Sequence, residues 1–224
     1  MTEPVTPDPV DAPHTSRRRA IATVVAGLLL TGAPIGALWA WMAPALHGVV
    51  VLTHSGDRVH DYLGPESEHF FVAAVLMLGL MNVVAVVAAV LVWQWRPHRG
   101  PGMVAGLCAG VLGAAAAAAG VGALLVHLHY GTVNFDKAPV THDNPVYYFT
   151  QAPPVFFGHT ALQVACTLLL PVATAALVYA VLAAANPRDD LGGYPGVESA
   201  PAPAAVVWVS SDAVIADGGA PSVR

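Results

Sequence analysis

Four long stretches of the chain carry almost no charge, and each is long enough to cross a lipid bilayer as a helix. They cover about residues 20–45, 65–94, 102–127 and 155–185. A helix needs about 20 mostly apolar residues to span the hydrocarbon core of a membrane. Charged residues make up only 10% of the 224 residues, against about 25% in a typical soluble domain. The sequence therefore predicts an all-α membrane protein, a four-helix transmembrane bundle.

The third stretch has the most distinctive packing pattern. Its small residues recur at every fourth position, which places them in one row along a helix. Small residues let two helix backbones approach closely, and such packing drives helix association in lipid. Because the row drifts slowly round the helix axis, it can serve two neighbours, one near each end. We expect the third helix to be the central packing helix, using Gly102, Gly106, Gly110, Ala114, Ala118 and Gly122.

The basic residues near the ends of these stretches predict the orientation in the membrane. Six lie on the side of the N-terminus and two on the opposite side. Under the positive-inside rule, both termini are then cytoplasmic and the two longer loops are extracytoplasmic. We expect a multi-pass plasma-membrane protein. The six are Arg17, Arg18, Arg19, Arg96, Arg99 and Arg188, and the two are Arg58 and Lys137.

The two ends of the chain predict disordered cytoplasmic tails, residues 1–16 and most of 187–224, around a transmembrane domain over 17–186. A short apolar island at 204–209 can pair with a partner strand. The Ser16-Arg17-Arg18 start also fits a twin-arginine export signal. The apolar run after it is long enough to span, and three more runs follow, so we expect an uncleaved signal anchor.

The two longer loops predict a small β cap outside the membrane. Residues 49–54 and 58–62 are two β-like runs on either side of a Ser-Gly-Asp turn, which indicates a hairpin. The second loop, over 131–154, can add a strand to it. Pro65, followed by Glu66, is typical of a helix start, so the second helix should begin near Pro65.

Histidines provide the main candidates for chemistry. Eight of the ten lie in the outer loops or at the outer ends of the stretches. Neutral imidazoles there can bind zinc, another borderline metal or haem iron, with His69, His127 and His159 as candidate ligands. The alternative is a wet membrane rim that binds nothing, because no HExxH or CxxC spacing fixes a site. We assign no cofactor and expect the three rings not to converge.

The two cysteines point to packing rather than chemistry. Cys108 and Cys166 lie inside apolar stretches and form no CxxC pair. We expect both to be buried free thiols that act as small packing residues.

Transport and catalysis have weaker support. Pro34 and Pro171 interrupt the first and fourth stretches, as in the broken helices of transporters. However, no ionisable residue occupies the middle of any stretch, where ion and proton paths place them. The His159-Thr160 and His54-Ser55 pairs match no nucleophile motif, so we assign no catalytic residue. The polar residues inside the stretches can instead hydrogen-bond between helices; they are Asn82, Gln163, Thr167 and Thr174.

Four segments resemble a known family: His60–Gly64, Val92–Met103, Ala152–His159 and Arg188–Pro195. Together they are similar to an actinobacterial, chiefly mycobacterial, family of four-span membrane proteins of unknown function. The resemblance covers about residues 19–195. It implies the four-span topology and a plasma-membrane location in an envelope-rich bacterium, and it implies no activity.

The favoured function is therefore a structural or interaction subunit of envelope machinery. Its expected partners are the lipid bilayer and other membrane or envelope proteins. A net charge of −5 without a basic patch argues against nucleic acid. The alternatives are a small transporter and a metal- or haem-binding bundle that uses the outer histidines.

Overall fold

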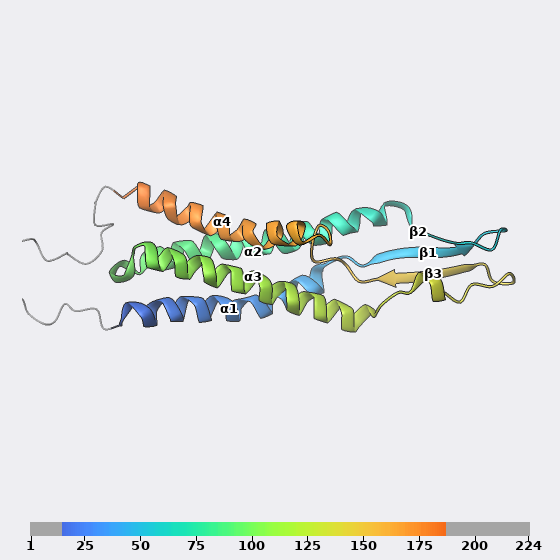
Figure 1. The fold of residues 1–224 in the computed structure, drawn as a ribbon, viewed down its shortest axis with the longest axis horizontal. Coiled ribbons are helices and arrows are strands. Elements are labelled where there is room, and N and C mark those ends of the chain that lie inside the picture. Colours follow the sequence, from blue (N-terminus) through green and yellow to red (C-terminus); the bar gives the residue numbers. More distant parts are fainter. Residues whose placement is uncertain (1–14, 187–224) are drawn as a thin grey trace, which may run out of the picture.

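The computed structural model describes residues 15–186 as four helices and a small sheet. The helices are long and apolar enough to cross a membrane. They lie side by side, and the sheet extends beyond them at one end (Figure 1). The predicted tails and the 204–209 island lie outside the described residues. The elements are α1 (Arg17–Met42), β1 (Leu46–Leu52), β2 (Arg58–Tyr62), α2 (His69–Gln94), α3 (Pro101–Tyr130), β3 (Val146–Gln151) and α4 (Ala161–Ala184).

The first helix is set by local signals at both ends. The Ser16 hydroxyl accepts a hydrogen bond from the Arg19 N–H at 3.4 Å, which is a serine N-cap. At the other end, Ala43 is extended because it precedes Pro44, which disfavours helical backbone before it. α1 therefore ends at Met42, a few residues before the predicted end at 45.

The second helix begins close to its predicted start. A 3-10 turn over Gly64–Glu68 carries Pro65 in its first turn and leads directly into α2. The fourth helix begins six residues later than predicted. The Thr160 hydroxyl accepts from the Gln163 N–H, and the Gln163 side chain accepts from the Thr160 N–H. This capping box fixes the start at Ala161, so residues 155–160 form no helix.

The sheet is antiparallel, with the strand order β2-β1-β3. The predicted hairpin is confirmed, and the second loop supplies the third strand. In the register, Val50 pairs with His60 on one side and with Tyr147 on the other. Val50 and Phe149 are buried in a small core of their own with Ala138 and Val140. The loop after α3 therefore covers one face of the sheet.

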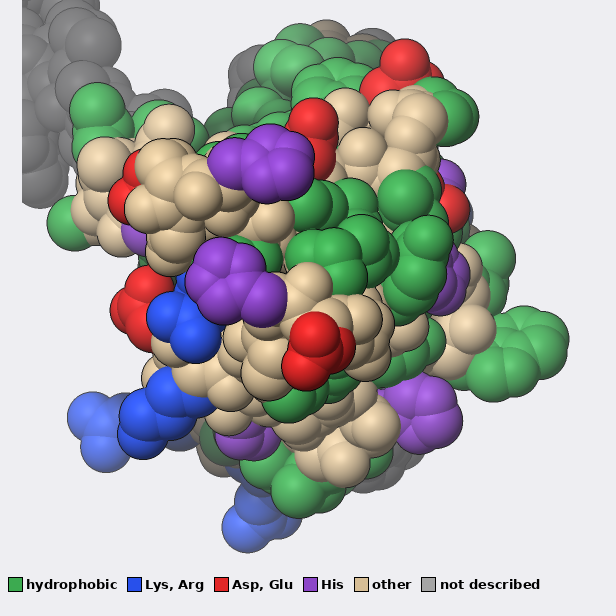
Figure 2. Space-filling model, turned by 90° about the vertical axis from the view of Figure 1, so that its right-hand side faces the viewer, with side chains coloured by type: hydrophobic (Ala, Val, Ile, Leu, Met, Phe, Trp, Pro, Cys, Tyr) green, Lys and Arg blue, Asp and Glu red, His purple; other side chains and the backbone are tan. Residues whose placement is uncertain are grey.

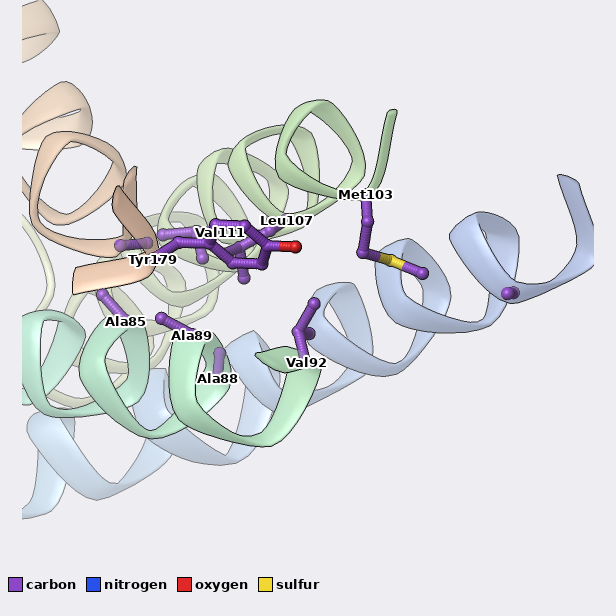
Figure 3. Packing of buried hydrophobic residues seen from close by; sticks show 10 residues of the cluster. Ala85, Ala88, Ala89, Val92, Met103, Leu107, Val111 and Tyr179 are labelled. Atoms are coloured by element: carbon purple, nitrogen blue, oxygen red, sulfur yellow. The ribbon is translucent and has the colours of Figure 1, made fainter. Parts of the chain in front are cut away.

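Two apolar clusters hold the helices together. One lies toward the sheet and contains Trp39, whose indole N–H donates to the Ala73 carbonyl at 2.8 Å. The other lies toward the far end, and Figure 3 shows its side chains meeting between α2, α3 and α4. Its labelled members are Ala85, Ala88, Ala89, Val92, Met103, Leu107, Val111 and Tyr179. Many contacts in both clusters are made by alanine, so the backbones lie close together.

Candidate functional site

The small-residue row of α3 faces α1 along most of its length. Ala114 and Ala118 are buried, and side chains of α1 lie over the glycines of the row. At the sheet end, Met77 of α2 also approaches the row. The side-chain contacts are Gly102 and Gly106 with Ile21, Gly110 with Leu28, and Gly122 with Trp39.

A matching pair of glycines on α1 completes this contact, and the sequence interpretation missed it. Gly32 lies against the carbonyl oxygen of Ala114, and Gly36 lies against that of Ala118. A Cβ atom at either glycine would overlap the α3 backbone. Their spacing of four was the available signal, because it is the small-xxx-small pattern of close helix pairs.

Polar residues join α2 to α4 at one point. The Thr174 hydroxyl donates to Asn82 Oδ1 at 2.6 Å, and Asn82 Nδ2 donates to the Leu78 carbonyl at 2.8 Å. This confirms the predicted hydrogen bond between helices for Asn82 and Thr174. For Gln163 and Thr167 the prediction is wrong, because the side chains of both bond within the α4 region.

The α2–α3 link closes the end of the bundle opposite the sheet. The Arg99 guanidinium lies 4.0 Å from the Trp93 ring centroid, and its Nε donates to the Trp93 carbonyl at 2.8 Å. The Gly100 N–H donates to the Tyr179 hydroxyl oxygen at 3.2 Å. His98 is buried beside Trp95. The link thus ties α2, α3 and α4 together.

The three candidate metal ligands occupy two different places. His127 and His159 line one cavity of about 270 Å³, and His69 does not line it. His159 lies before the start of α4, although the predicted stretch 155–185 included it. Within residues 15–186, no group of three or more His, Cys, Asp or Glu side chains is placed to hold a metal ion.

His69 belongs instead to a junction centred on Glu66. Glu66 Oε2 lies 3.0 Å from His69 Nδ1 and 3.2 Å from His47 Nδ1, and it accepts from the His47 N–H at 3.1 Å. His69 Nδ1 is also 2.8 Å from the Ala45 carbonyl, so this nitrogen carries the proton. The junction holds the start of β1 against the start of α2.

A second set of contacts fixes the sheet over the helices. The Tyr62 hydroxyl donates to Gln151 Oε1 at 2.9 Å, and the Tyr62 ring packs edge-on to Phe70 of α2 at 5.1 Å. Burial raises the pKa of the Tyr62 hydroxyl above its ordinary value.

The face of the sheet that turns away from its core is open and carries several apolar side chains beside one carboxylate. The register places Val51 between Val59 and Val146, and Val49 between Asp61 and Tyr148. Tyr148 is 68% exposed, Val59 53% and Val51 36%. Figure 2 looks onto this end of the molecule, where histidine and acidic side chains lie among hydrophobic ones. Contiguous exposed apolar side chains of this kind mark interaction surfaces.

The cysteines differ from each other. Cys108 is partly buried, whereas Cys166 is exposed, so the expectation that both are buried is wrong for Cys166. α4 packs through Thr167, Pro171 and Ala175. Cys166 precedes this stripe and points out of the bundle.

Comparison with known proteins places these features in a family. The family model "Protein of unknown function (DUF2567)" matches residues 28–193. "Uncharacterized protein ML1222" of Mycobacterium leprae (strain TN) is 61% identical over 193 residues, covering 86% of this chain and 98% of that protein. "Uncharacterized protein Rv1591" of Mycobacterium tuberculosis (strain ATCC 25618 / H37Rv) is 58% identical over 173 residues, covering 77% and 90%. No solved structure matches the chain.

The family match covers most of the chain, including all four helices and the three strands in whole or in part. It confirms the resemblance inferred from the sequence segments. This chain belongs to the DUF2567 family, whose mycobacterial members include these relatives.

Proposed function

We propose that the chain is an integral plasma-membrane protein whose extracytoplasmic sheet binds another membrane or envelope protein. The four apolar helices support insertion in the membrane. Charge supports the orientation: five arginines lie at the helix ends opposite the sheet, and two basic residues lie at the sheet end. Both termini are then cytoplasmic. The five are Arg17, Arg18, Arg19, Arg96 and Arg99, and the two are Arg58 and Lys137.

The exposed apolar face of the sheet is the observation that carries the binding role. Val51, Val59 and Tyr148 are the exposed apolar side chains of this face and belong to the sheet, outside the helices. The Glu66 junction and the edge-on contact of the Tyr62 ring with Phe70 fix the sheet to α2. A rigid apolar platform loses little conformational entropy when a partner docks on it. A water-exposed apolar face is itself unfavourable, so covering it favours association.

Photo-crosslinking tests the binding role. A photoreactive phenylalanine analogue at position 148 should give a discrete cross-linked product in cells, identified by mass spectrometry as an envelope protein. The same analogue at Tyr147, which pairs with Val50 on the other face, is the matched control and should give none. Val59→Asp should abolish the product, since it places a charge in the contact. Equal products from positions 147 and 148, or a product that survives Val59→Asp, contradict the proposal.

Reporter fusions test the topology separately. A reporter active only outside the cytoplasm should work when fused after Thr141, in the second loop, and fail when fused after Gly196. Activity after Gly196 contradicts the proposed orientation of the C-terminus.

A further inference from the structure

Two cavities flank the segment that joins β3 to α4, residues 152–160. One, of about 500 Å³, lies between this joining segment and the first turn of α2, at Phe70 and Phe71. The other, of about 270 Å³, lies between the segment and the end of α3, at Val126 and His127. We call the two the rim cavities. They share five lining residues: Ala152, Pro154, Phe156, Gly158 and His159.

The lining of the larger rim cavity is largely aromatic. Four phenylalanines line it, and no Lys, Arg, Asp or Glu lines either cavity. The rings of Phe71 and Phe157 lie 5.7 Å apart, so they join α2 to the joining segment. Such a lining takes hydrocarbon, and a charged solute would have to lose its hydration there without a counter-charge.

The rim cavities continue into the apolar outer surface of the helices. Phe71 is 65% exposed and Phe157 is 41% exposed, although both line the larger cavity. Val72 and Val75 of α2 and Leu162 of α4 are exposed close by in the chain. In the proposed topology this surface faces the lipid of the outer leaflet, so lipid chains have direct access to the cavity.

The backbone amides of the joining segment need hydrogen-bond acceptors from whatever occupies the cavity. Among the described residues, no backbone hydrogen bond involves the amides of residues 155–159. An amide N–H at the edge of the hydrocarbon region needs an acceptor, because leaving it unpaired costs free energy. An occupant that fits therefore combines an apolar chain with acceptor oxygens.

We propose that the larger rim cavity binds a diacyl phospholipid of the outer leaflet. One acyl chain packs against the four phenylalanines, and the ester oxygens accept from the amides of residues 155–159. A lining without Lys, Arg, Asp or Glu suits the uncharged glycerol-ester region of the lipid. The proposal rests on the membrane insertion argued above, and it deepens that proposal by assigning a lipid to one site. The phenylalanines are Phe70, Phe71, Phe156 and Phe157.

Photolabelling of the full-length protein tests the site. The purified protein is placed in phosphatidylcholine vesicles that contain a phosphatidylcholine with a diazirine near the ester end of one acyl chain. After irradiation, labelled residues are mapped by mass spectrometry. We expect several-fold more label at residues 70–71 and 152–159 than at Leu124 and Leu128, which are exposed at the sheet end of α3 but do not line the cavities. Label spread evenly over these positions overturns the proposal.

A cavity-filling variant provides the second arm. Ala152→Phe should remove the excess label at residues 70–71, whereas the matched variant Leu177→Phe should leave it unchanged. Excess label that persists in a folded Ala152→Phe protein overturns the proposal. If that variant does not fold, the wild-type map alone decides. Alkaline carbonate extraction separates the two proposals: protein released without detergent refutes membrane insertion, whereas retained protein with even labelling refutes only the lipid site.

Discussion

Among the single residues, Glu66 shows how two segments about 20 residues apart in the chain depend on one side chain. It contacts His47 of β1 and His69 of α2, and His69 in turn contacts the backbone between α1 and β1. The sequence identified Glu66 as a helix-start acid and His69 as a metal candidate, but it gave no sign that they meet. Their contact depends on how the strand returns to the helix, which no local pattern encodes.

Replacing Glu66 with glutamine should loosen the sheet from the helices. The substitution keeps the shape of the side chain and removes the charge that attracts both imidazoles, so their hydrogen bonds weaken. We expect faster protease cleavage in residues 52–58, the tip of the hairpin, with the helices intact. Glu68→Gln is the control, since Glu68 is exposed and its side chain caps no helix. Equal cleavage rates in the two variants would refute the role of Glu66.

The hydrogen bond between Thr174 and Asn82 should contribute measurably to the stability of the protein. Thr174→Val removes the donor and leaves Asn82 Oδ1 without its partner on α4. Hydrogen bonds between helices in membranes contribute about 0.6 kcal/mol on average and at most about 1.7 kcal/mol. We expect a loss in that range in the free energy of unfolding in detergent. Thr23→Val, whose hydroxyl bonds within its own helix, should have a smaller effect.

Among the helices and strands, local patterns predicted the four helices and the hairpin, whereas the pairing of distant segments left no local pattern to read. Length and hydropathy identified four helices, and a turn sequence identified the β1–β2 hairpin. The start of α4 was misplaced because residues 155–160 continue an apolar run, and the capping signal from Thr160 to Gln163 was overlooked. The pairing of β1 with β3 joins segments about 100 residues apart, so it was only a possibility in the sequence.

The close contact between α1 and α3 leads to a prediction at this scale. Gly36→Ala adds a Cβ where the Ala118 carbonyl lies, so α1 must move away from α3. Overpacking of this kind costs about 1–3 kcal/mol. We expect a lower thermal stability in detergent and less accumulated protein. Gly27→Ala on the same helix is the matched control, because nothing lies within 4 Å of its added Cβ.

A larger substitution extends this test to the row on α3. Gly110→Leu should separate the helices, since Leu28 and the Val25 backbone occupy the space beside it. Gly120→Leu on the same helix should be tolerated, because that position is open. If Gly110→Leu accumulates like the parent protein, the central packing role of the row is wrong.

The whole molecule combines a tightly packed set of apolar helices with a sheet that extends beyond them at one end (Figure 1). The helices bury small residues against each other, whereas the sheet leaves an apolar face open. From the distribution of arginines we propose that the sheet lies outside the cell. The orientation therefore decides which partners the open face can meet.

Labelling of single cysteines tests this orientation most directly. In a background with Cys108→Ala and Cys166→Ala, Tyr148→Cys should react with a membrane-impermeant maleimide in sealed right-side-out vesicles. Arg96→Cys, at an exposed position of the α2–α3 link, should react only after the vesicles are permeabilised. Reaction at position 96 in sealed vesicles, with position 148 protected until permeabilisation, would contradict the account.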